Sequence, residues 1–185
     1  MAEIDEKTAA GMEIFRQFVF DGQLTEAEKK KIITEADRLG RERAQQIRKE
    51  FGDRDPEELL KEAGIEVISE SGTSKYNSDY VKFAEFYAKK GQIRLNAYAV
   101  RKLDKKLKPG LAKNIILCHE LYHYFEISRW GNTSDLFVRT VRLFGWIPAR
   151  RRILPAAEIA ADSFAETYLK LDFNPRKIEA LYFEP

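Results

Sequence analysis

His119-Glu120-Leu121-Tyr122-His123 contains both histidines of this 185-residue chain. Side chains at positions i and i+4 project from the same face of an α-helix, so two imidazoles at this spacing can bind one metal ion. Glu120 would then lie beside the open position of that metal, where a general base for water is needed. The stretch therefore predicts a helix that carries a metal site. The alternative is an exposed helix face of histidine and glutamate that binds no metal.

A catalytic zinc ion takes three protein ligands and a water molecule, so this site needs a third side chain. No histidine remains, and Cys118, the only cysteine, precedes His119 by one position and therefore points about 100° away from the metal face. We expect Cys118 to be a small core residue and the third ligand to be a carboxylate. The downstream candidates are Glu126, Asp135, Glu158, Asp162 and Glu166.

Two of these candidates, Glu158 and Asp162, lie four positions apart in a helical pattern rich in small residues, which can pack closely against the motif helix. One of them can bind the metal while the other accepts the N–H of a ligating imidazole and fixes its tautomer. Glu126 lies a further turn along the motif helix, so we expect it at the surface or behind the metal ligands. We expect Asp135 to cap a helix and Glu166 to be a solvated or capping charge.

The composition limits the other classes of function. Hydrophobic residues make up 44% of the chain, which is enough for a packed core, and 32 basic residues nearly balance 30 acidic ones. This balance argues against binding to nucleic acid or to anionic lipid, and the basic run at 29–31 is typical of a solvated helix face. The single cysteine, the charged N-terminus and the lack of a long apolar run predict a cytoplasmic protein with no membrane span.

Helical patterns come first along the chain, then a group of strand patterns, then further helical patterns. They predict helices at 3–20, 27–51, 57–63, 97–103 and 111–128, strands at 65–69, 81–88 and 92–95, and a polar loop at 71–78. Grouped strands and helices indicate an α+β fold, with a small three-stranded sheet packed on the motif helix. We expect an N-terminal helical segment at 1–52 and a metal-binding domain at 53–185. We also expect 92–95 to be an edge strand, to which an extended peptide could add.

An aromatic and basic stretch separates the second histidine from Glu158. It contains Trp130, Phe137, Phe144 and Trp146, followed by three arginines at 150–152. The favoured interpretation is a helical insertion that buries its aromatic rings and leaves the arginines in solvent. The alternative is a lid or a substrate-recognition element, in which case the arginines predict acidic residues in the target.

The motif and the downstream helix together resemble the gluzincin arrangement and, more narrowly, the ImmA/IrrE family of metallopeptidases. The similarity covers about residues 53–171. The segments that carry it are Asp55-Pro56-Glu57-Glu58-Leu59-Leu60, Gly64-Ile65-Glu66-Val67, Gln92-Ile93-Arg94-Leu95-Asn96, Leu117-Cys118-His119-Glu120-Leu121-Tyr122-His123-Tyr124 and Glu158-Ile159-Ala160-Ala161-Asp162-Ser163-Phe164-Ala165. The resemblance implies a zincin-like fold, with His119, His123 and Glu158 as zinc ligands, Glu120 as the catalytic base and Asp162 as the helper carboxylate.

The resemblance further implies a zinc endopeptidase that hydrolyses a peptide bond in a specific intracellular protein, such as a transcriptional repressor, through zinc-activated water. Tyr122 departs from the glycine usual in the family and would alter how the motif helix packs. The oxyanion stabiliser stays open, because nothing selects among Tyr98, Tyr124 and Arg94. The chain ends soon after the ligand helix, which predicts no appended DNA-binding or sensor domain.

Two other classes of function stay open. The first is a proteolytically silent metal-binding regulator that acts by protein–protein interaction, for which the glutamate of the motif would be dispensable. The second is a helical interaction or DNA-binding protein without a metal, which rests on the basic helix at 27–51. A DNA-binding protein would show steeply salt-dependent binding to duplex DNA.

Overall fold

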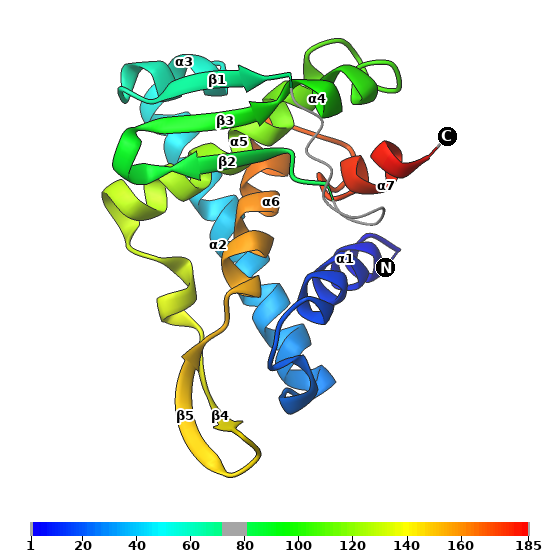
Figure 1. Ribbon diagram of the computed structural model, residues 1–185, viewed down its shortest axis with the longest axis vertical. Helices are drawn as coiled ribbons and strands as arrows, with labels where there is room; N and C mark the ends of the chain where they lie inside the picture. Colours follow the sequence, from blue (N-terminus) through cyan, green and yellow to red (C-terminus); the bar gives the residue numbers. More distant parts are fainter. Residues whose placement is uncertain (1, 72–80, 185) are drawn as a thin grey trace.

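The computed structural model describes residues 2–71 and 81–184, and its architecture is α+β (Figure 1). The α-helices of the described part are α1 (Ala2–Arg16), α2 (Glu26–Phe51), α3 (Pro56–Glu62), α4 (Ala97–Leu103), α5 (Leu111–Phe125), α6 (Pro155–Leu169) and α7 (Lys177–Phe183). The strands are β1 (Glu66–Glu70), β2 (Ala84–Tyr87), β3 (Gln92–Asn96), β4 (Val138–Leu143) and β5 (Ile147–Arg152). None of the helices in this part of the chain is long and apolar enough to cross a membrane.

Local capping signals fix the starts of the predicted helices. Thr25 accepts a hydrogen bond from the Glu28 N–H at 3.2 Å, while the Glu28 carboxylate accepts one from the Thr25 N–H at 2.9 Å, and this capping box begins α2. Asn96 accepts the N–H of Ala99 at 3.0 Å and begins α4. Both predicted helices are confirmed. Apart from Ser71, the polar loop predicted at 71–78 lies outside the described residues.

The three-stranded sheet has the order β1-β3-β2. β3 pairs in parallel with β1 and antiparallel with β2, so both of its edges are used. The prediction that 92–95 forms an edge strand is therefore wrong, because the parallel pairing with β1 places β3 at the centre. The edge beside the motif helix belongs to β2, and α5 lies under the sheet (Figure 1).

Three helices, α2, α5 and α6, form what we call the helix stack, in which α6 packs against both α2 and α5. A Cβ atom added to Gly40 of α2 would lie 2.2 Å from the carbonyl oxygen of Ala160 in α6, so the two backbones are in direct contact. Residues from both predicted segments, 1–52 and 53–185, share the main hydrophobic core, among them Phe15, Ile32 and Phe164.

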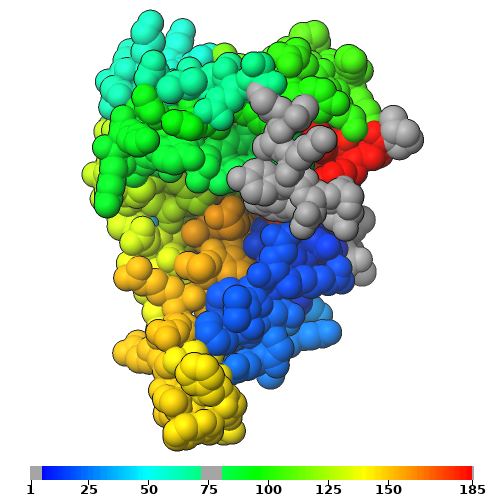
Figure 2. All heavy atoms as spheres, in the orientation of Figure 1, coloured from blue at the N-terminus to red at the C-terminus, as the bar shows by residue number. Residues whose placement is uncertain are grey.

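The stretch before α6 forms a β-hairpin, so the predicted helical insertion is wrong. β4 and β5 pair antiparallel from Val138 opposite Arg152 to Leu143 opposite Ile147. Phe144 and Gly145 both have positive φ, and the Trp146 N–H donates to the Leu143 carbonyl, as in a type I′ turn. The hairpin projects from one end of the molecule (Figures 1 and 2). Its tip leaves Phe144 88% exposed and Trp146 75% exposed, so these two rings are not buried as predicted.

Candidate metal centre

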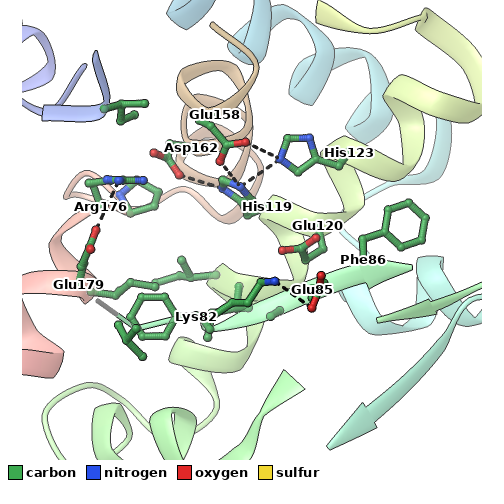
Figure 3. A pocket seen from close by; sticks show the side chains of 18 of the residues that line it. Lys82, Glu85, Phe86, His119, Glu120, His123, Glu158, Asp162, Arg176 and Glu179 are labelled. Carbon is green, nitrogen blue, oxygen red and sulfur yellow. Dashed lines mark hydrogen bonds and ion pairs between the residues drawn. The ribbon is translucent and has the colours of Figure 1, made fainter. Parts of the chain in front are cut away.

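Two helices of the stack bring the predicted site residues together. α5 carries His119, Glu120 and His123, and α6 carries Glu158 and Asp162 on the facing side (Figure 3). α6 can approach this closely because much of its buried surface consists of alanine side chains. The carboxylates therefore reach the imidazoles across a short gap.

Three side chains converge on one point. The Nε2 atoms of His119 and His123 lie 3.2 Å apart. The two carboxylate oxygens of Glu158 lie 3.3 Å from the His119 Nε2 and 3.6 Å from the His123 Nε2. Ligand atoms bound tetrahedrally at zinc distances of about 2.0–2.1 Å would be separated by about 3.3 Å. The described residues contain one group of histidine, cysteine and acidic side chains suited to a metal ion, and it is this one.

The other ring nitrogen of each histidine contacts a second carboxylate. The His119 Nδ1 lies 2.9 Å from Asp162 Oδ1, and the His123 Nδ1 lies 2.7 Å from Glu126 Oε2. A carboxylate at this position accepts the Nδ1–H and leaves the Nε2 lone pair free for a metal. Both imidazoles are thus held with Nε2 turned toward Glu158 (Figure 3).

Glu126 lies behind the histidines and is only 5% exposed, so of its two expected positions the surface one is wrong. Its second oxygen, Oε1, accepts the backbone N–H of Thr133 at 2.6 Å. At Glu126 the chain changes from α5 to a π-helical turn, Glu126–Trp130, a distortion that is frequent at functional sites. The three-residue spacing from His123 placed these side chains next to each other on the helix, and this signal could have identified the pair.

The charges around the imidazoles favour a cation. Burial alone would lower the pKa of His119, but hydrogen bonds to Asp162 and Glu158 raise that pKa well above its usual range. Burial would also lower the pKa of His123, and its hydrogen bond to Glu126 together with the charge of Glu158 raises it. Burial would raise the pKa of Glu158, yet its hydrogen bond with His119 and the charge of His123 lower it to about 2. The same carboxylates that stabilise protons on the imidazoles would stabilise a metal ion in their place.

Glu120 lies on the β2 side of the imidazoles (Figure 3) and lines a cavity of about 640 Å³ with them. Burial raises the pKa of Glu120, although the neighbouring histidines act in the opposite direction. A raised pKa suits a carboxylate that takes up and returns a proton near neutral pH. The wall opposite α5 includes residues 81–86, so the open edge of β2 faces this cavity.

The three residues considered for an oxyanion stabiliser do not line this cavity. Tyr98 is exposed, Arg94 pairs with Glu70 on the sheet, and Tyr124 packs against a ring of β2. Sequence reasoning missed two cationic residues that do line it, Lys82 and Arg176 (Figure 3). Lys82 lies two residues before the edge strand and Arg176 directly precedes α7, and both are far from the motif in sequence, so no local pattern could have identified them.

The remaining predicted residues serve other contacts. Cys118 is buried and free in the core, as expected. Asp135 forms an ion pair with Arg152 of β5, and Asn132 holds the cap position of the short helix Thr133–Leu136. Glu166 pairs with Lys7 of α1 at 2.7 Å, so it is neither a solvated nor a capping charge.

Comparisons with known proteins give no match: no family model fits the chain, and neither the curated proteins nor the solved structures contain one that is significantly similar to it.

Proposed function

We propose that this chain is a zinc-dependent endopeptidase with a zincin-like domain, acting on a specific protein in the cytoplasm. One observation carries the proposal: the Nε2 atoms of His119 and His123 lie 3.2 Å apart, and each lies within 3.6 Å of a carboxylate oxygen of Glu158, which suits tetrahedral zinc. Asp162 and Glu126 support it, because each holds one imidazole in the tautomer that a metal requires. The resemblance to ImmA/IrrE metallopeptidases points to the same ligands, and a transcriptional repressor is one substrate of the kind it suggests.

Each part of the cavity has a defined task in this reaction. A zinc ion held there would supply Lewis acidity, which acidifies a water molecule and polarises the scissile carbonyl. Glu120 accepts the proton of the attacking water and delivers it to the leaving amine. The open edge of β2 binds the substrate backbone in extended form by main-chain hydrogen bonds. Lys82 and Arg176 line the same cavity and are the candidates for stabilising negative charge on the carbonyl oxygen.

The first test is metal content, measured by mass spectrometry on the purified protein and two variants. We expect about one zinc per chain in the wild type, as a site with three protein ligands predicts. Glu158→Ala should lose the zinc, whereas Glu166→Ala, on the same helix but paired with Lys7, should keep it. A wild-type protein without zinc, or zinc retained by Glu158→Ala, would contradict the proposed ligand set.

The second test is cleavage of a proteome-derived peptide library. The zinc-loaded wild type should cut a restricted set of peptides, and Glu120→Gln should keep its zinc and lose the activity by at least about 100-fold. Full zinc content without any cleavage by the wild type would favour the proteolytically silent regulator instead. Equal cleavage by wild type and Glu120→Gln would remove Glu120 from the mechanism.

A further inference from the structure

A second cavity, of about 550 Å³, lies between the hairpin and the segment that follows α1. We call it the basic groove, and its described lining residues outside the metal centre are Phe18, Val19, Phe20, Arg150, Arg151, Arg152, Leu154 and Pro155. It shares Ile14, Gln17 and Glu158 with the cavity of the metal centre, so the two are continuous at a proposed zinc ligand. Figure 2 shows the hairpin, in yellow, beside the N-terminal segment, in blue.

Only one of the three arginines of the basic groove forms an ion pair among the described residues. Arg152 pairs with Asp135, but within 2–71 and 81–184 no ion pair is formed by Arg150 or Arg151. Arg151 also stands directly opposite Arg139 in the hairpin, and like charges in this position destabilise a pair of strands. The only carboxylate that lines the groove among the described residues is Glu158, at its inner end. The positive charges of Arg150 and Arg151 are therefore not neutralised by ion pairs within the described part of the chain. An anionic partner could neutralise them.

Apolar side chains accompany these charges. Val19 and Leu154 line the groove and are 88% and 59% exposed, and the tip of the hairpin presents Phe144 and Trp146 to solvent. Val19 and Leu154 thus add exposed apolar surface to the arginines of the same groove. The groove therefore suits a segment that combines acidic with apolar residues.

We propose that the basic groove binds acidic residues of the protein substrate, to one side of the bond that is cut. This inference rests on the proposed peptidase function. A peptide held along β2 passes Glu158, and the groove opens from the same cavity, so a continuing chain can enter it. An anionic membrane is the other partner that arginines and aromatic rings can bind, but a lipid surface would not fill a concave groove that leads to the metal centre.

The test is a charge reversal in the groove, Arg150→Glu with Arg151→Glu, compared with Lys105→Glu with Lys108→Glu. The two lysines are exposed in the turn after α4, away from the groove, and their double variant undergoes the same change in net charge. All three proteins are loaded with zinc and digest the same peptide library. Zinc content and thermal midpoint are measured alongside, to show that each variant is folded.

We expect the wild type and the lysine variant to prefer peptides with Asp or Glu at fixed positions on one side of the cut. The arginine variant should lose this preference by about tenfold, the ratio that corresponds to 1.4 kcal/mol, and favour Lys or Arg at those positions. If all three proteins cleave with the same preference, the basic groove does not select charge and the inference is overturned, while the peptidase function stands.

If the zinc-loaded wild type cleaves nothing, a separate binding measurement tests whether the basic groove binds acidic peptides. The probe is a fluorescein-labelled peptide of alternating Leu and Glu, compared with its Leu–Gln counterpart by fluorescence anisotropy. Preference for the Glu peptide, lost in the arginine variant alone, would support the groove even though the peptidase proposal had failed. Equal binding of both peptides would overturn the inference. Arginine-dependent binding to phosphatidylcholine–phosphatidylglycerol vesicles without any peptide preference would also overturn it, in favour of a membrane.

Discussion

The two tryptophans of the chain lie in regions that are built in opposite ways. Trp130 packs against the helix stack, with its ring 5.3 Å from that of Phe125 and 4.6 Å from the guanidinium carbon of Arg43. Trp146 lies at the tip of the hairpin and is 75% exposed. In the helix stack, buried contacts determine where each side chain points, and this holds the two histidines in place. In the hairpin, most side chains face solvent and are free to contact a partner.

The closest contact of the helix stack gives the largest expected effect. In Gly40→Ala, the new Cβ would lie 2.2 Å from the Ala160 carbonyl oxygen, so α2 and α6 must move apart. Overpacking against backbone is more costly than against a flexible side chain, and we expect the free energy of unfolding to fall by about 3 kcal/mol or more. Urea denaturation measures this free energy of unfolding. Gly22→Ala is the control, because a Cβ there meets nothing within 4 Å, and an equal loss in both variants would contradict the close packing.

The local parts of this fold could be predicted from the sequence. Helix caps at Thr25 and Asn96 depend on residues three positions apart, and the motif histidines and the Glu158–Asp162 pair depend on a spacing of four. Each of these signals lies within one helix, so the sequence shows it directly. The convergence of α5 and α6 was inferred from small side chains, which predict close packing.

The prediction that β3 is an edge strand failed because strand order depends on contacts between distant segments. Whether β3 is central or at an edge is decided by its pairing with β1, 26 residues away at Glu66 and Gln92, and no local pattern encodes this pairing. The prediction of a helical insertion, where the structure has a hairpin, failed for a different reason. Gly145 after the run of β-branched residues and arginines at 138–142 was a turn signal, but aromatic rings were expected to be buried, which favoured a helix.

A buried polar network supports the π-helical turn behind His123 and gives an intermediate effect. The Tyr122 hydroxyl lies 2.5 Å from both Arg43 Nη1 and Thr133 Oγ1, and the Thr133 N–H holds Glu126. In Tyr122→Phe, the guanidinium of Arg43 and the hydroxyl of Thr133 each lose a hydrogen-bond partner. We therefore expect the free energy of unfolding to fall by about 1–3 kcal/mol. Tyr98→Phe is the matched control, because that ring is exposed. The network would be structurally unimportant if both variants unfolded at the same urea concentration.

The smallest expected effect is at the tip of the hairpin, and it tests the contrast between the two regions most directly. Trp146→Ser removes a large ring that few neighbours contact, so the free energy of unfolding should change by no more than about 0.5 kcal/mol. Trp130→Ser is the same substitution at a ring that packs against the helix stack. It should lower the free energy of unfolding by about 3 kcal/mol, as the loss of a packed aromatic ring does. Thermal and urea denaturation of the two variants provide the comparison. A substantial loss in Trp146→Ser would mean that the ring packs within the folded chain, and it would then no longer count among the exposed apolar side chains that mark the hairpin as a binding surface.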